Sequence, residues 1–133
     1  MGLTSEERTA IVRVRLGNAK KTFAEVSILM NNALWRTAAN RLYYACFYAA
    51  SALLINDGHQ AHTHNGVISL LGMHYISKKI INEDLGDIYR KLFNLRQKGD
   101  YDDWTVVKES DLLTLIEPAE QFIKTIEELI TNK

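Results

Sequence analysis

The sequence has little of what holds small extracellular proteins together, because Cys46 is its only cysteine. A single cysteine excludes an intramolecular disulfide framework and is typical of a reducing compartment. Its neighbours in LYYACFYAASALL are apolar, so we expect a small buried hydrophobic side chain rather than a reactive thiol. A chain of 133 residues buries roughly two-thirds of its unfolded surface in one core, so we expect a single domain over residues 1–133.

Neither sign of charge is in excess, since Lys plus Arg and Asp plus Glu both number 16. The balance argues against a protein that coats polyanions non-specifically, and a nucleic-acid surface would require local clustering of basic residues. No uninterrupted apolar run approaches the roughly 20 residues of a membrane-spanning helix. The N-terminal MGLTSEERTA lacks the basic and then apolar order of a signal peptide. We therefore expect a cytoplasmic protein with no membrane contact.

The sequence is instead rich in helical periodicity. Between about residues 5 and 30, apolar side chains alternate in steps of four and three, which predicts one stripe along a helix. The members of this stripe are Val12, Leu16, Ala19, Phe23, Val26 and Met30. Thr4 and Glu7 have the spacing of a capping box at the start of this helix.

The same reasoning predicts further helices and an all-α fold. Their expected ranges are about 34 to 55, His64 or Asn65 to about Ile76, 84 to 98, and 109 to 131. Gly99 is expected to end the fourth helix in a left-handed cap. Pro118, the only proline, should kink the last helix or divide it in two. No strand pattern competes, so we predict an antiparallel, up-and-down bundle of four to five helices.

Polar and aromatic side chains form a stripe along the second predicted helix, although most of its circumference is apolar. They recur at steps of four and three residues and comprise Thr37, Arg41, Tyr44, Tyr48 and Ser51. The stripe is a rim or dimer surface whose hydroxyls reach water, a ligand groove or catalytic cleft in which Arg41 meets an anion, or an internal polar network. Spacing alone leaves these three interpretations open.

The segment LFNLRQKGDYDDW places cations, acids and aromatic rings together at a predicted helix end. Its polar and aromatic members include Arg96, Lys98, Asp100, Tyr101 and Trp104. Helix-dipole and turn chemistry account for the cations and the aspartates. An arginine followed by acid, phenol and indole groups is also suited to anion binding, base stacking and proton transfer. Both interpretations remain open from the sequence.

All four histidines lie between His59 and His74, which raises the question of a metal site. Zinc needs three or four converging ligands, whereas His74 is expected almost three helical turns beyond His64 and no HExxH pattern is present. We therefore expect no metal and no cofactor. His59 and His62 are expected to be exposed loop residues, and His64 a capping or cleft residue.

Three segments, in order between residues 40 and 104, match the consensus elements of one known family. NRLYYACFYAASALL matches RxYYAxFxAAxALL, THNGVISLLGMHYI matches THxGVxxxFGxHF, and LGDIYRKLFNLRQKGDYDDW matches LxxLxxLRxxADYD. The chain thus resembles the HEPN family, the higher eukaryotes and prokaryotes nucleotide-binding domain. The resemblance implies a bundle of four or five helices that is commonly a homodimer. It also implies a nucleotidyltransferase partner, with which many members form a toxin and antitoxin or nucleotide-handling pair.

Many HEPN toxins are metal-independent ribonucleases with an RxxxxH-type motif, and this chain departs from that motif. Arg96 matches the arginine, but Tyr101 stands where the histidine is expected. A tyrosine with a pKa of about 10 is a poor general acid or base at neutral pH, which argues against ribonuclease activity. Some HEPN toxins are adenylylated by their partner on a tyrosine near this motif, so modification of Tyr101 is a hypothesis.

The resemblance and the residue types together predict one cleft and leave three functions open. Arg96, Tyr101 and His64 are the candidate catalytic residues. The candidate ligand-binding residues are Arg41, Tyr44, Tyr48, Lys98, Asp100 and Trp104. The first function is a weakly catalytic or non-catalytic module that binds a nucleotide or RNA, or docks the nucleotidyltransferase. The second is a metal-independent endoribonuclease, and the third is a purely structural interaction protein.

Overall fold

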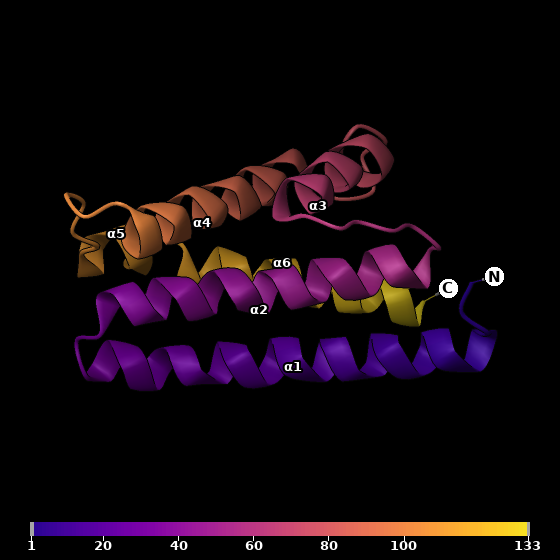
Figure 1. The fold of residues 1–133 in the computed structure, drawn as a ribbon, viewed down its shortest axis with the longest axis horizontal. Coiled ribbons are helices and arrows are strands. Elements are labelled where there is room, and N and C mark those ends of the chain that lie inside the picture. Colours follow the sequence, from indigo (N-terminus) through magenta and orange to yellow (C-terminus); the bar gives the residue numbers. More distant parts are fainter. Residues whose placement is uncertain (1, 133) are drawn as a thin grey trace.

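The computed structural model describes residues 2–132 and confirms an all-helical bundle (Figure 1). Its elements, in order, are α1 (Ser5–Asn31), α2 (Trp35–Asn56), α3 (His64–Leu71), the π-helical turn η1 (Gly72–Ile76), α4 (Glu83–Tyr101), α5 (Glu109–Leu113) and α6 (Ile116–Thr131).

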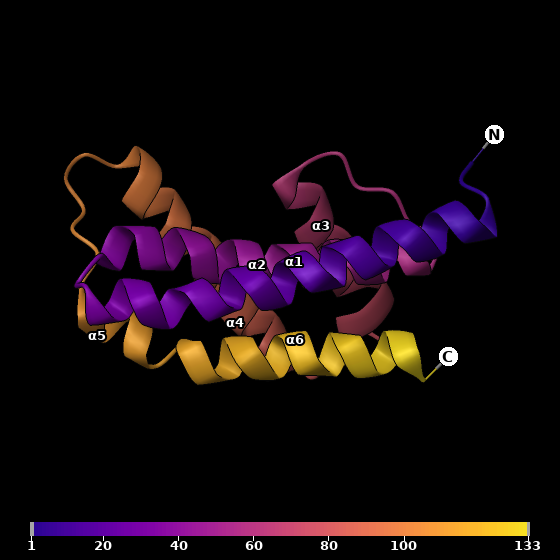
Figure 2. The same ribbon diagram turned by 90° about the horizontal axis from the view of Figure 1, so that it is seen from below.

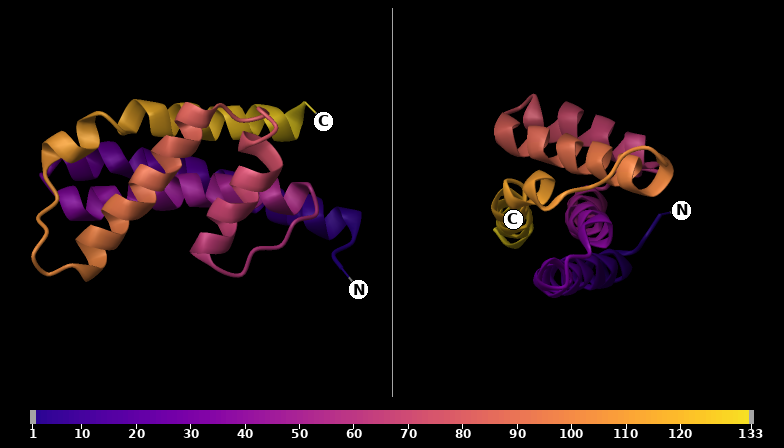
Figure 3. Two further views of the ribbon diagram at one scale, coloured as in Figure 1. Left: turned by 90° about the horizontal axis from the view of Figure 1, so that it is seen from above. Right: turned by 90° about the vertical axis from the view of Figure 1, so that its left-hand side faces the viewer.

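α2 is the central helix of the bundle. It packs against α1, α4 and α6, and the end-on view places it between α1 on one side and α3 and α4 on the other (Figure 3). Twelve of its residues are buried, most of them alanine or leucine. Small side chains allow the neighbouring helices to approach closely, so α2 forms the middle of the core, which agrees with the apolar circumference of this segment.

The beginning of α1 has the predicted capping box. The Thr4 hydroxyl accepts from the Glu7 backbone N–H at 3.0 Å, and the Glu7 carboxylate accepts from the Thr4 N–H at 2.9 Å. These contacts satisfy two backbone donors that a helix N-terminus leaves free. No helix within residues 2–132 has both the length and the apolar composition needed to cross a membrane.

The prediction that Gly99 ends the fourth helix is wrong. α4 continues to Tyr101, and Gly58 is the only glycine with a positive φ in the described part of the chain. A Cβ at Gly99 would lie 3.1 Å from Val107 Cγ2 and 3.3 Å from Arg36 Cγ. Glycine therefore serves close packing here and not a left-handed cap.

The C-terminal helix is divided in two, as Pro118 predicted. α5 ends at Leu113 and α6 begins at Ile116. Pro118 lies in the first turn of α6, where its missing N–H removes no helical hydrogen bond. The third predicted helix also differs from expectation: it ends as a regular helix at Leu71 and continues as η1, in which Ser77 N donates to Gly72 O at 2.9 Å.

Candidate functional site

A buried arginine surrounded by aromatic rings lies where α2, α3 and α4 meet. Arg96 of α4 is 4% exposed. Its guanidinium carbon lies 4.9 to 5.7 Å from the centroids of four rings. The four rings are those of Tyr43, Tyr44, Phe93 and Tyr101. We call these four residues, together with Arg96 and His64, the Arg96 cluster. Ring faces carry a negative quadrupole, so they stabilise a cation that has little contact with water.

The charge of Arg96 is only partly balanced by a carboxylate. Arg96 Nη1 lies 3.9 Å from Asp100 Oδ2, and Arg96 Nε has no hydrogen-bond partner within residues 2–132. The same Asp100 oxygen accepts from Asn40 Nδ2 at 2.9 Å. Asn40 Oδ1 in turn accepts from Arg41 Nε and Nη2 at 3.0 and 2.8 Å. Two guanidinium groups therefore share one carboxylate through a neutral amide.

Arg41 forms the outer part of this arrangement. It is half-buried, and its guanidinium carbon lies 5.3 Å from the centroid of the Tyr44 ring. No carboxylate of the described chain lies within ion-pair distance of Arg41. A planar guanidinium stacked on a ring and paired with an amide keeps its charge available for a carboxylate or phosphate.

His64 is fixed against α2 by the start of α3. Thr63 caps this helix, since its hydroxyl accepts from Gly66 N at 2.9 Å, and His64 is the first helical residue. His64 Nδ1 lies 2.7 Å from the hydroxyl oxygen of the buried Tyr43. The hydroxyl donates when the imidazole proton is on Nε2 and accepts when it is on Nδ1, and either arrangement orients the ring.

The electrostatic surroundings keep His64 neutral. Burial lowers the pKa of His64, and the positive charge of Arg96 lowers it further. Burial also raises the pKa of Tyr43, so its hydroxyl remains protonated. The site therefore holds a neutral imidazole, a protonated phenol and a buried cation together.

The structure brings six of the predicted site residues together and separates others. Those that meet are Arg41, Tyr44, His64, Arg96, Asp100 and Tyr101. Tyr48 lies at the edge, with its ring centroid 6.0 Å from that of Tyr44. Lys98 is exposed, and Trp104 is 94% exposed on the segment after α4. Lys98 and Trp104 thus point to solvent.

Three residues of this site, Asn40, Tyr43 and Phe93, were not singled out from the sequence. Asn40 connects Arg41 to Asp100, and Tyr43 connects Arg96 to His64. Both lie in the NRLYYACF segment that carried the family resemblance. Their neighbours Arg41 and Tyr44 drew attention by their helical spacing, whereas Tyr43 lies on the apolar face of α2 and Asn40 lies outside the stripe.

The histidines are arranged differently from expectation. His62 is exposed in the loop, as predicted, but His59 is half-buried. Its ring stacks on that of His74, with centroids 4.0 Å apart. The prediction of an exposed His59 is therefore wrong, because the loop after α2 folds back onto η1. Within residues 2–132, no three His, Cys, Asp or Glu side chains are grouped to hold a metal ion.

The motifs that build this site lie within a longer match. The HEPN domain family model matches residues 12–129, from α1 to the last turns of α6. The chain belongs to the HEPN domain family. The family predicted from three short segments is thereby confirmed.

Relatives that align over most of this HEPN protein include proteins of Thermotoga maritima and Methanocaldococcus jannaschii. A "UPF0332 protein" of Thermotoga maritima is 32% identical over 126 residues, covering 95% of this chain and 96% of that protein. The "Putative toxin MJ0605" of Methanocaldococcus jannaschii is 34% identical over 127 residues, covering 94% of this chain and 90% of that protein. The "Putative toxin MJ0142" of the same organism is 24% identical over 115 residues, covering 86% and 78%.

Proposed function

We propose that this HEPN protein is the toxin-type member of a toxin–antitoxin pair and binds a phosphate of RNA or of a nucleotide beside the Arg96 cluster, with weak or no catalysis. Two relatives that align over most of the chain have names that contain the word toxin. Arg41 is the first contact in this proposal, because it lies at the rim and its charge is not neutralised by a carboxylate.

The observation that carries the proposal is the shared carboxylate of Asp100. A phosphate that binds Arg41 competes with Asp100 for the Asn40 amide, whose nitrogen now donates to Asp100 at 2.9 Å. Asp100 lies in the last turn of α4, and helix ends open at little cost. Displacement of Asp100 exposes Arg96, so the phosphate gains a second guanidinium. A site with two cations and one carboxylate at a helix end thus favours an incoming anion.

Equilibrium titration with ATP, GTP and short RNAs tests this function. Loss of a charge-assisted hydrogen bond costs about 1.5 to 3 kcal/mol, so we expect Arg41→Gln to weaken binding about 10- to 100-fold. Arg90→Gln is the control, because Arg90 is exposed and lies six residues before Arg96 on the same helix. Binding to the wild type should weaken with salt. Equal affinities for the wild type, Arg41→Gln and Arg90→Gln proteins would contradict the proposal.

A metal-independent endoribonuclease is the second candidate, and the neutral His64 beside Arg96 favours it. In this reaction His64 accepts the proton of a ribose 2′ hydroxyl, whose oxygen attacks the adjacent phosphorus. The bond to the 5′ oxygen breaks, that oxygen takes a proton from water, and the protonated His64 returns its proton to the solvent. Arg96 stabilises the charged phosphorane. Cleavage of total RNA in EDTA is expected for the wild type and not for His64→Asn. Equal background from both proteins rejects this candidate.

A nucleotidyltransferase is the partner that we propose for this protein. Tyr101 is 74% exposed, so its hydroxyl is accessible to an enzyme that transfers an adenylyl group. Co-purification with the product of the adjacent gene, followed by mass measurement with and without ATP, tests both docking and modification. A stable complex with unmodified Tyr101 rejects the modification and retains the docking.

A further inference from the structure

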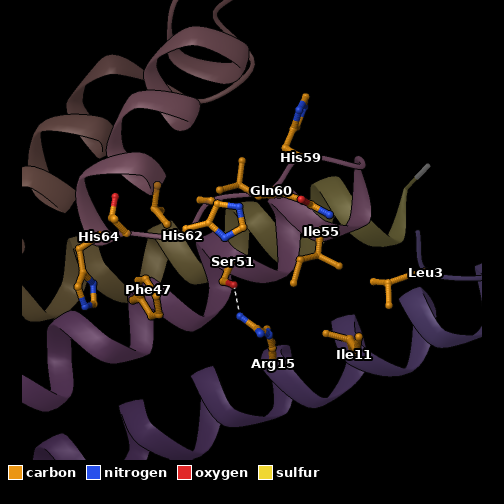
Figure 4. Close-up of a pocket in the computed structure, with 14 residues that line it drawn as sticks. Leu3, Ile11, Arg15, Phe47, Ser51, Ile55, His59, Gln60, His62 and His64 are labelled. Carbon is orange, nitrogen blue, oxygen red and sulfur yellow. Dashed lines mark hydrogen bonds between the residues drawn. The ribbon is translucent and has the colours of Figure 1, made fainter. Parts of the chain in front are cut away.

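A cavity of about 440 Å³ lies between α1, the C-terminal half of α2 and the loop that leads into α3 (Figure 4). One part of its wall is apolar and includes Ile11, Phe47 and Leu54. Another part carries Arg15 and three of the four histidines, His59, His62 and His64. The cavity therefore combines an apolar surface with hydrogen-bond donors, as small-molecule sites do.

The lining of this cavity includes no carboxylate. Four other hollows on the described chain each include at least one glutamate, namely Glu83, Glu6, Glu25 and Glu109. The cavity at Arg15 is thus distinguished by an unopposed positive charge. The first turn of α3 borders the same wall. The N-terminal end of a helix carries a partial positive charge, so it adds to the positive charge of Arg15.

Arg15 is held toward the cavity by a neutral partner. Its Nη1 donates to the hydroxyl of Ser51, and Figure 4 shows this contact between α1 and α2. No carboxylate within residues 2–132 forms an ion pair with Arg15. Ser51 is 8% exposed in a helix face of alanines and leucines. A hydroxyl orients the guanidinium without neutralising it, so the remaining N–H donors keep their affinity for an anion.

We infer that this cavity binds a small organic anion, whose carboxylate or phosphate group contacts Arg15 and whose apolar body packs against Phe47 and Leu54. Arg41 and Arg96 do not line this cavity, whereas His64 belongs both to the Arg96 cluster and to the cavity lining. On one side the ring of His64 packs on that of Phe47, with centroids 4.8 Å apart. On the other side its Nδ1 faces the Tyr43 hydroxyl. A ligand in the cavity therefore perturbs His64 without contacting Arg41 or Arg96.

NMR titration of the full chain with phenyl phosphate, benzoate, inorganic phosphate and benzyl alcohol tests the inference. We expect saturable shifts of the Ser51 amide and of amides in residues 59–67 with phenyl phosphate, with benzoate, or with both. The comparison of these two probes shows which acid group the cavity takes. Inorganic phosphate should bind at least tenfold more weakly because it lacks the apolar body, and neutral benzyl alcohol should give no saturable shift.

Two arginine variants and one control locate the binding. Arg15→Gln should weaken the binding of the preferred aromatic anion at least tenfold, whereas Arg13→Gln, an exposed position on the same helix, should leave it unchanged. Arg41→Gln should also leave it unchanged, which separates this site from the proposed phosphate site. The absence of saturable shifts, equal binding by Arg15→Gln and Arg13→Gln proteins, or equal binding of benzyl alcohol would overturn the inference. Shifts centred on Asn40 and Arg41 would overturn it as well.

Discussion

His64 is a neutral imidazole because its surroundings oppose a second positive charge. Burial and then Arg96 lower its pKa. An unfolded histidine has a pKa of about 6.5, so the unfolded chain binds more protons than the folded one as pH falls below that value. The free energy of unfolding should therefore decrease with falling pH. Burial, His59 and Lys78 lower the pKa of His74 and act in the same direction.

We predict that His64→Gln makes the protein less sensitive to acid. The variant loses the contact with Tyr43 and should be less stable than the wild type at about pH 7, by roughly 1 kcal/mol. It should lose less stability than the wild type between about pH 7 and pH 5, because one proton-linked term is absent. Urea unfolding at both pH values measures the free energy of unfolding of each protein. His62→Gln is the control, because His62 is exposed. An identical pH dependence for His64→Gln and the wild type would show that folding does not lower the pKa of His64.

At the scale of elements, α4 packs against η1 at Gly86. Gly86 is buried in α4, and a Cβ there would lie 2.5 Å from Ile76 Cδ1 and 3.3 Å from Ile76 Cγ1. Overpacking of this kind costs about 1 to 3 kcal/mol. The higher helix propensity of alanine stabilises the folded state by about 1 kcal/mol. The two effects have opposite signs, so the contact with Ile76 decides the outcome.

We predict that Gly86→Ala destabilises the protein by about 1 kcal/mol and that Ile76→Val relieves the clash by removing Cδ1. A double-mutant cycle from denaturant unfolding should give a favourable coupling of about 1 kcal/mol. Gly17→Ala is the control: Gly17 lies within α1 and its added Cβ would meet nothing within 4 Å. That substitution should stabilise by up to about 1 kcal/mol. If Gly86→Ala stabilised the protein as much as Gly17→Ala, Ile76 would have moved away from the added methyl group without an energetic cost.

Local signals in the sequence predicted most of the elements, because they depend on residues within one or two turns. Periodicity located the long helices, Thr4 located a helix start, and Pro118 located the division near the C-terminus. The prediction of a helix cap at Gly99 was wrong because a glycine near a helix end is suited both to a cap and to a close contact. The contact with Val107 arises only when the chain after α4 folds back.

The site was predictable only in part, since its contacts join distant segments. The family motifs identified Arg96 and His64, and helical spacing identified Arg41 and Tyr44. The bond from Asn40 to Asp100 spans 60 residues, and that from Arg15 to Ser51 spans 36. No periodicity within one helix specifies which residue of another helix it meets, so these partners required the tertiary structure.

At the scale of the whole molecule, the segment between α4 and α5 lies at one end of the bundle (Figure 2). This segment and the last residue of α4 carry exposed apolar side chains, which we call the apolar patch. Tyr101, Trp104 and Val106 are 74%, 94% and 73% exposed. Lys98 and Asp102 are close to them in the sequence and are also exposed. A patch with both signs of charge can pair with itself about a twofold axis, so that Lys98 of one copy meets an aspartate of the other. We expect a second copy of the chain to cover this patch in a homodimer.

We predict that Trp104→Glu weakens self-association at least about 30-fold, the effect of losing roughly 2 kcal/mol from a central aromatic contact. Burial of a glutamate in an apolar interface without a partner adds a desolvation cost to the lost contact area. Sedimentation velocity over a range of concentrations measures the dimer fraction. Val14→Glu is the matched control, because Val14 is 61% exposed on α1 and should leave self-association unchanged. A wild-type chain that stays monomeric at every concentration would refute the homodimer. If that monomer then binds the product of the adjacent gene and Trp104→Glu abolishes the binding, the patch serves the partner protein, because large exposed apolar patches mark interaction sites.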